Sequence, residues 1–155
     1  MPAETLLHYL EEKDIDYEVL RHEKAYTAQE VAAAAHISGD AVAKAVMVIV
    51  DGEMGMAVLP ASYRVNLDHL KEQLGAKQVR LATEKEFKDR FPDCDLGALP
   101  PFGNLYDIPI YADERLSEEI DLAFCGGSHT ELIRISFEAF KRLAEPRIHK
   151  FAYHA

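Results

Sequence analysis

The stretch Ala41–Val50, AVAKAVMVIV, decides the fold. It is apolar apart from Lys44 and rich in β-branched residues, a pattern typical of a strand buried on both faces at the centre of a sheet. Asp51-Gly52 follows directly and predicts a tight turn, after which Met56–Leu59 pairs back as a hairpin. We therefore expect residues 42–50 to form a central strand.

Helix and strand signals alternate on both sides of this hairpin. Capping boxes at Thr27–Glu30 and Thr83–Glu86 predict two helix starts, and Asn66 with Gly75 predicts the start and end of another helix. The expected helices are Glu4–Lys13, Thr27 to about His36, Asn66 to Leu74, Thr83 to Pro92, and Ser136 to Pro146. The expected strands are Tyr17–His22, Val42–Val50, Met56–Leu59, Lys77–Leu81, Ile108–Ala112, Asp121–Phe124 and Leu132–Ile135. This order predicts an α/β fold, a mixed and partly closed sheet of about seven strands surrounded by about five helices, in a single domain over residues 1–155.

Composition excludes several classes of protein. The 155 residues are 48% hydrophobic and 28% charged, which argues against a disordered chain. The longest apolar run, Ala45–Val50, is far shorter than a membrane helix. The sequence does not show the basic segment followed by an apolar one that would indicate export. Cys94 and Cys125 lie far apart with no CxxC, so we expect neither a disulfide framework nor a four-thiolate zinc site, and a reduced, cytoplasmic compartment.

Charge argues against general nucleic-acid binding. The chain carries 17 Lys and Arg against 27 Asp and Glu, a net charge of −10, and this surface repels phosphate. A more basic stretch runs from Arg64 to Arg90, and solvated helix faces explain it as well as a local binding site does.

Lys44 is the first candidate site residue, because a buried ammonium is costly unless an anionic or polar group meets it. It either pairs with a carboxylate, points into a cleft where a ligand supplies the anion, or extends from the end of its strand to solvent.

Two glycine-containing segments are the other candidates. Gly97–Gly103, GALPPFG, combines two prolines with two glycines, so it is either a stiff loop whose amides approach a ligand or a plain connection. Gly126-Gly127 follows a strand, where paired glycines let a ligand approach the backbone. His129 could donate a hydrogen bond or serve a structural role, and Cys125 is a nucleophile only if a base adjoins it. Motifs typical of dinucleotide, nucleoside triphosphate, zinc-protease and serine-hydrolase sites are absent from the sequence.

These features occur together in one known family. The chain resembles the YbaK / prolyl-tRNA synthetase-associated domain family over nearly its whole length. The landmarks are Tyr26–Val31 (YTAQEV), Ala43–Val46 (AKAV), Leu74–Ala76 (LGA), Gly97–Gly103 (GALPPFG) and Phe124–Gly127 (FCGG). The family's strand lysine matches Lys44, its GxxxP loop matches Gly97 and Pro101, and its late glycine turn matches Gly126 and Gly127.

The resemblance implies hydrolysis of the ester that joins an amino acid to the terminal adenosine of a mischarged tRNA, such as tRNA-Pro carrying alanine or cysteine. It implies a catalytic role for Lys44 and no metal, cofactor or protein nucleophile. Substrate-binding roles fall on Gly97, Pro101, Gly103, Gly126, Gly127 and His129. A ribose hydroxyl of the substrate would help to activate water.

The expected partner is the acceptor end of aminoacyl-tRNA, with an aminoacyl-tRNA synthetase or another translation protein as a second partner, and no membrane. A non-catalytic module that binds a nucleotide, an amino acid or a tRNA end is the alternative, and a regulatory protein without a small ligand is a third.

Overall fold

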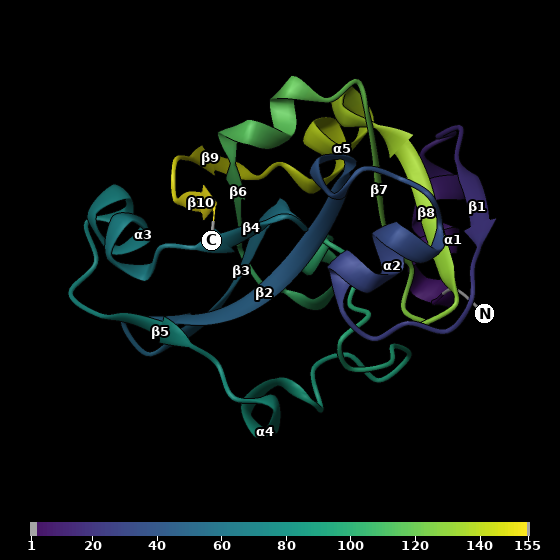
Figure 1. Ribbon diagram of the computed structural model, residues 1–155. Helices are drawn as coiled ribbons and strands as arrows, with labels where there is room; N and C mark the ends of the chain where they lie inside the picture. Colours follow the sequence, from purple (N-terminus) through teal and green to yellow (C-terminus); the bar gives the residue numbers. More distant parts are fainter. Residues whose placement is uncertain (1–2, 155) are drawn as a thin grey trace.

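The hairpin of β2 and β3 forms the centre of the computed structural model, which describes residues 3–154 (Figure 1). β2 (Val42–Val50) has the predicted limits, and β3 (Glu53–Pro60) is longer than expected at both ends. The two strands pair antiparallel, with Lys44 opposite Leu59 and Val50 opposite Glu53. Asp51 and Gly52 have φ values of 48° and 85°, the left-handed pair that closes a two-residue hairpin turn.

The predicted mixed α/β sheet is confirmed. The strand order is β1-β8-β7-β2-β3-β6-β9, with β5 also paired to β2, and β4 and β10 form a separate two-stranded sheet. β2 with β7, β3 with β6, and β6 with β9 are parallel pairs, whereas the other pairs are antiparallel. The remaining strands are β1 (Glu18–Arg21), β4 (Tyr63–Val65), β5 (Val79–Leu81), β6 (Ile110–Asp113), β7 (Asp121–Cys125), β8 (Glu131–Ser136), β9 (Arg147–His149) and β10 (Ala152–His154). The sequence did not predict β4, β9 and β10, because a strand of three residues is too short to show a period.

The predicted helices form, but several are shorter than expected. They are α1 (Glu4–Glu12), α2 (Ala28–Ala34), α3 (Leu67–Leu74), α4 (Glu84–Phe87) and α5 (Phe137–Ala144), with short 3₁₀ turns at Gly39–Ala41, Gly103–Tyr106 and Glu114–Glu118. Thr27, Asn66 and Ser136 cap α2, α3 and α5 through side-chain oxygens that accept backbone N–H bonds. The expected helix up to Pro92 is wrong beyond Phe87, because residues 88–90 are exposed and offer nothing to pack against the sheet.

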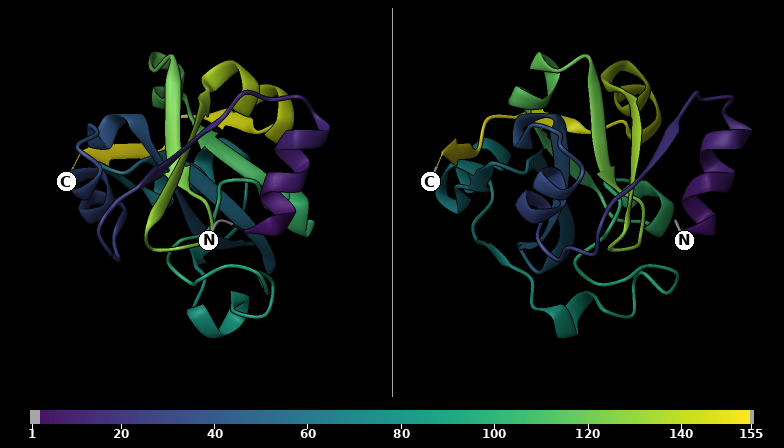
Figure 2. Two further views of the ribbon diagram at one scale, coloured as in Figure 1. Left: turned by 90° about the vertical axis from the view of Figure 1, so that its right-hand side faces the viewer. Right: turned by 45° about the vertical axis from the view of Figure 1, so that its right-hand side comes forward.

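β2 contributes to all three hydrophobic clusters, which explains its central place. Met47 belongs to the largest cluster, Val42 to a second with α2, and Val48 to a third with α3 and the C-terminal segment. α1 and α5 share the largest cluster and lie outside the strands (Figure 2), where the Tyr9 hydroxyl donates to the Leu143 carbonyl at 2.8 Å. No helix among residues 3–154 is both long and apolar enough to span a membrane. The expected domain limits, residues 1 and 155, lie outside the described residues.

A split in the sheet beside β2 positions the candidate site. On the side of β2 opposite β3, β7 pairs with Val42 and Ala43, whereas β5 pairs with residues 48–50. Within the part of the chain that the structure describes, residues 44–46 have no strand partner on this side. The start of α2 and the loop around Gly97 approach this split, because their residues line the same cavities as Lys44.

Candidate functional site

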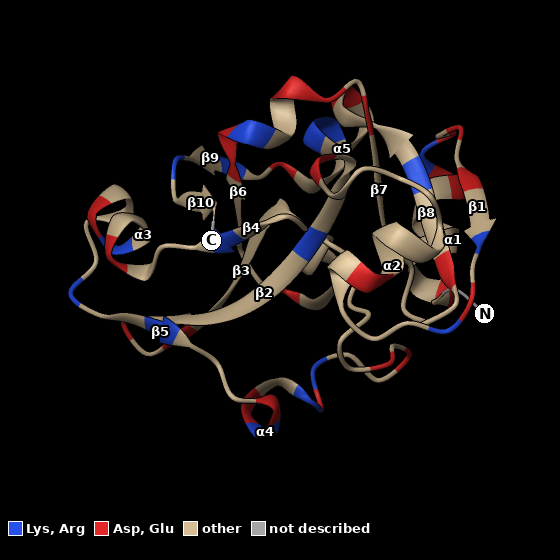
Figure 3. Cartoon of the chain, viewed as in Figure 1, with Lys and Arg blue, Asp and Glu red and all other residues tan. Residues whose placement is uncertain are grey.

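Lys44 is a half-buried cation without a carboxylate partner. Figure 3 shows β2 in tan except for its lysine. The Lys44 Nζ donates to the Ala61 carbonyl at 3.3 Å, and no carboxylate among residues 3–154 lies within ion-pair distance of it. Burial, and secondly the positive charge of Arg64, lower the pKa of the ammonium. Of the readings left open by the sequence, the carboxylate pair is therefore excluded for the described chain.

Two adjoining cavities meet at Lys44 and Gly97. The outer cavity, about 390 Å³, is lined by Tyr26, Thr27, Ala28, Gln29, Lys44, Ala45, Ala61, Arg64 and Gly97. The inner cavity, about 100 Å³, is lined by Ala28, Ala43, Lys44, Ala45, Met47, Phe87, Gly97, Leu99 and Cys125. The outer cavity is lined by two cationic side chains, Lys44 and Arg64, and by polar side chains such as Gln29. The inner cavity shares Lys44 with it, but most of its other lining side chains are apolar. A ligand that extends through both would pass a cation at their junction.

The glycine turn after β7 holds the Gly97 loop in place. The Gly127 amide donates to the Ala98 carbonyl at 2.9 Å, and the Gly127 carbonyl accepts from Asp95 N–H at 2.8 Å. Gly127 has a φ of 100°, and a Cβ there would lie 3.0 Å from the Ala3 Cβ, so only glycine fits. The Gly126 amide points to the Glu131 carbonyl at 3.5 Å. Both of these N–H groups therefore donate to carbonyls of the protein itself. The turn affects the cavities by holding the Gly97 loop in position.

Gly97 lies at the cavities in a left-handed conformation, with a φ of 87°. Its amide N–H has no hydrogen-bond partner among residues 3–154. That this amide faces a bound carbonyl or phosphate oxygen stays a prediction.

His129 packs against Tyr26 and lines neither cavity. The two rings pack with centroids 4.9 Å apart and planes inclined by 53°. The ring Cε1 of His129 would also lie 3.5 Å from a Cβ placed on Gly97. His129 therefore lies beside Tyr26 and Gly97, two residues that line the outer cavity.

Pro101 and Gly103 are not brought to the cavities. Both are buried, and Gly103 opens a 3₁₀ turn whose carbonyl accepts from Ile108 N–H at 2.9 Å. A Cβ on Gly103 would lie 2.8 Å from the Ile108 carbonyl oxygen, so close packing accounts for this glycine. Of the seven residues selected from the sequence, Lys44 and Gly97 line the cavities, three lie in the segment 126–129 that contacts the Gly97 loop, and these two lie elsewhere.

Sequence reasoning missed several cavity residues. Tyr26 and Gln29 stood within a recognised landmark, and Arg64 stood within the basic stretch, but none was selected as a site residue. Phe87 carried no signal, because its helix is one turn long and shows no periodicity.

Neither cysteine is prepared to act as a thiolate. Burial raises the pKa of the Cys125 thiol, which lines the inner cavity, to about 11. Burial likewise raises the pKa of Cys94 to about 11, and its Sγ lies 3.5 Å from the Tyr106 hydroxyl. No group of three or more His, Cys, Asp or Glu side chains among the described residues could hold a metal ion.

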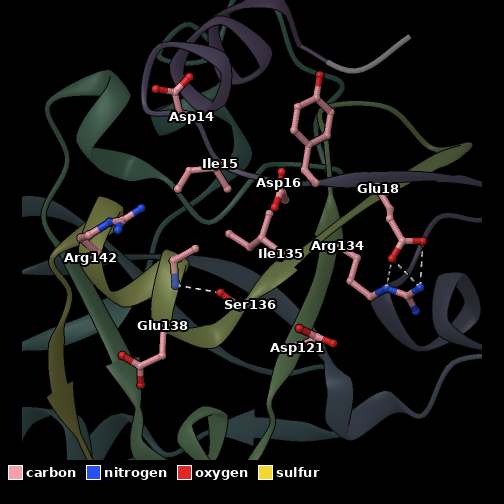
Figure 4. A pocket seen from close by; sticks show the side chains of 12 residues that line it. Asp14, Ile15, Asp16, Glu18, Asp121, Arg134, Ile135, Ser136, Glu138 and Arg142 are labelled. Carbon is pink, nitrogen blue, oxygen red and sulfur yellow. Dashed lines mark hydrogen bonds and ion pairs between the residues drawn. The ribbon is translucent and has the colours of Figure 1, made fainter.

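A larger cavity, about 610 Å³, lies away from Lys44 between β1, β8 and α5 (Figure 4). Its lining includes five acidic residues, and Arg134 is paired with Glu18 at 2.9 Å. Such a lining disfavours a phosphate-rich ligand, so the split beside β2 is the better candidate for a nucleotide.

Comparison with known proteins points the same way. Residues 22–143 match the model of the aminoacyl-tRNA editing domain. The chain is 28% identical over 154 residues to the multifunctional Ser/Thr-tRNA deacylase ProXp-y of Escherichia coli, covering 94% of this chain and 90% of that protein. It is 34% identical over 107 residues to the proline–tRNA ligase of Shouchella clausii, covering 69% of this chain but spanning only 18% of the ligase. A crystal structure of a candidate trans-editing enzyme for prolyl tRNA synthetase superposes with a TM-score of 0.81 at 20% identity, covering 96% of this chain and 95% of that one.

Proposed function

Because the chain belongs to the aminoacyl-tRNA editing domain family, we propose that it is a trans-editing deacylase that hydrolyses the ester of mischarged aminoacyl-tRNA. The single observation that carries the proposal is the meeting, at Lys44 and Gly97, of a cavity with two cationic side chains and a smaller cavity lined mainly by apolar side chains. The ester of an aminoacyl-tRNA likewise joins a polar nucleotide to a small side chain. The Escherichia coli deacylase, aligned over nearly its whole length, supports an enzyme that acts in trans.

The outer cavity has the groups that a terminal adenosine needs. Tyr26 is 59% exposed and presents a ring on which a base can stack. Arg64 and Lys44 lie where they can meet phosphate or ribose oxygens. Gln29 adds amide hydrogen-bonding groups. The acceptor end is therefore the part of the tRNA that this site would contact. The protein would act in the cytoplasm, where a synthetase or other translation protein would supply further affinity for RNA.

The proposed chemistry is the attack of water on the ester carbonyl carbon. The carbon–oxygen bond to the ribose breaks, the ribose oxygen takes up a proton, and a free amino acid and a tRNA result. Lys44 either stabilises the negative charge that develops on the carbonyl oxygen or binds the neighbouring phosphate, which is already charged, and the Gly97 amide positions the ester. The neighbouring ribose hydroxyl orients the water. This route uses neither a metal nor an acyl-enzyme, and the protonated thiol of Cys125 is consistent with it.

The inner cavity supports a small amino acid without a hydroxyl group. The cavity of about 100 Å³ is bounded by alanine, methionine, phenylalanine and leucine side chains, with Lys44, Gly97 and Cys125 on the remaining wall, and it accepts the side chain of alanine or cysteine. A seryl or threonyl hydroxyl that faces the alanine, methionine, phenylalanine and leucine side chains, away from Lys44, would be buried without a hydrogen-bond partner, which costs binding free energy. We therefore propose alanyl or cysteinyl esters, such as those on tRNA-Pro, rather than the seryl and threonyl esters named for the Escherichia coli relative.

The test is single-turnover deacylation of one tRNA-Pro body charged in turn with alanine, cysteine, serine, threonine or proline. We expect alanyl and cysteinyl esters to be hydrolysed faster than the other three. Binding of every charged tRNA without release of any amino acid would contradict the enzyme and favour the non-catalytic binding module.

A further inference from the structure

One wall of the inner cavity comes from α4, which projects from the rest of the molecule (Figures 1 and 2). Phe87 is the only residue of the segment 83–90 that is not exposed, and its ring packs against the largest hydrophobic cluster. The other wall residues belong to β2, α2, the end of β7 and the Gly97 loop. Phe87 is therefore the wall residue whose place depends on a single helical turn.

A polar clamp fixes that turn to the sheet. The Glu86 carboxylate accepts from Arg80 Nη1 at 2.8 Å and Nη2 at 2.9 Å, and from Thr83 N–H at 2.9 Å. Arg80 lies on β5, where it is paired with Ile49 of β2. The hydrogen bonds from Arg80 above all lower the pKa of Glu86 to about 2, so the carboxylate stays charged at neutral pH.

The clamp acts on orientation more than on overall stability. Both side chains are exposed, and exposed ion pairs contribute little to the free energy of unfolding. A bidentate pair nevertheless restricts geometry, and Phe87 is the next residue after Glu86. Holding Glu86 against β5 therefore restricts the direction in which the Phe87 ring can point.

We propose that Phe87 determines which amino-acid side chains the inner cavity admits, and that Arg80 and Glu86 are positioning residues that keep its ring in the wall. This assignment rests on the proposed function, because it takes the ligand of the inner cavity to be an aminoacyl ester. With the ring in place the cavity has a volume of about 100 Å³ and admits small side chains. With the ring absent or displaced, the cavity opens toward α4 and accepts a branched or longer side chain.

The test compares Phe87→Ala and Phe87→Leu with the unaltered protein on one tRNA body charged with alanine or with leucine. Phe87→Ala should raise the leucyl-to-alanyl ratio of single-turnover rates by about tenfold or more, the scale on which a pocket discriminates between side chains that differ by a few methylenes. Phe87→Leu should give an intermediate ratio, and it keeps the test decisive if Phe87→Ala fails to fold, as followed by thermal melting.

The clamp variants Arg80→Gln and Glu86→Gln should shift the ratio in the same direction by a smaller factor, and the double variant should shift it no further than either single one. Arg134→Gln is the matched control, because Arg134 donates to both Glu18 carboxylate oxygens at 2.9 and 3.0 Å on β8 and β1, outside the inner cavity. It should leave the ratio unchanged. An equal shift in Arg134→Gln would overturn the positioning role.

Binding of the non-hydrolysable 3′-amide analogues of alanyl- and leucyl-adenosine separates this assignment from the proposed function. Suppose that no ester is hydrolysed but the Phe87 variants still gain affinity for the leucyl analogue. The deacylase proposal then fails, whereas the role of Phe87 stands. Folded Phe87 variants with unchanged ratios, both in rate and in analogue affinity, would refute the role of Phe87.

Discussion

Lys44 combines a cost in stability with a proposed role in catalysis. We expect Lys44→Ala to lower single-turnover deacylation by tens- to a thousand-fold, because loss of one charge-assisted contact in the transition state is worth roughly 2–4 kcal/mol. The same change should leave the melting temperature at pH 7 unchanged or higher, since burial lowers the pKa of this ammonium. A lysine whose pKa is lowered by folding destabilises the fold at every pH at which it is protonated. Any gain in the melting temperature of Lys44→Ala should therefore shrink as the pH rises toward 10.5, the ordinary pKa of lysine. A variant that unfolds at pH 7 would make Lys44 a structural residue.

Cys125 provides the contrasting prediction at the residue scale. Its thiol lines the inner cavity, but burial raises its pKa to about 11, so the thiolate is scarce at neutral pH. We expect Cys125→Ala to retain alanyl-tRNA deacylation within about threefold of the unaltered rate, because no acyl-enzyme forms. Single-turnover release of alanine from charged tRNA, compared between the variant and the unaltered protein, measures this. Abolition of turnover by this substitution alone would replace the proposed mechanism with a thiol nucleophile.

At the scale of elements, Asp113 connects β6 to the C-terminal strand. Its side chain is 1% exposed, and Oδ2 accepts from Phe151 N–H at 2.8 Å and from Ala152 N–H at 2.7 Å. β10 begins at Ala152 and pairs with β4, which carries Arg64. We expect Asp113→Ala to lower the free energy of unfolding by on the order of 3 kcal/mol, because one buried and one partly buried amide lose their acceptor.

Denaturant unfolding measures this effect, with Asp121→Ala as an exposed acidic control expected to change stability little. Asp113→Ala should also weaken tRNA binding, since β10 no longer holds β4 and its Arg64 in place. A fall in stability no larger than that of Asp121→Ala would show that the C-terminal segment is held by other contacts.

At the scale of the whole molecule, a net charge of −10 opposes a broad RNA interface. Lys44 and Arg64 are the cations that line the two cavities. Two phosphate contacts to a single-stranded end predict a slope of about −1 to −2 for log affinity against log salt, and Arg64→Gln should reduce its magnitude by about 0.7. Titration of labelled tRNA between low and moderate salt checks this. A slope steeper than about −4 would indicate a wider basic footprint.

The sequence by itself determined the features that depend on neighbouring residues. The apolar run 42–50 predicted β2 to the residue, and Asn66 with Gly75 predicted both ends of α3. Side-chain caps and left-handed turn residues interact with backbone groups only three or four positions away, so a short stretch of sequence is enough to predict them. The same holds for the conspicuous lysine within β2, which predicted a site at that strand.

Tertiary structure alone decided what surrounds that lysine. β7 and β5 leave β2 at different points and so open the split, and no local pattern specifies where two strands diverge. Arg64 and Phe87 reach the cavities through β4 and α4, elements of three and four residues that form only by pairing with or packing on distant segments. Gly103, selected as a ligand contact, instead makes room for the Ile108 carbonyl. Contacts between residues far apart in the chain follow from how the whole sheet packs, and local sequence patterns do not specify them.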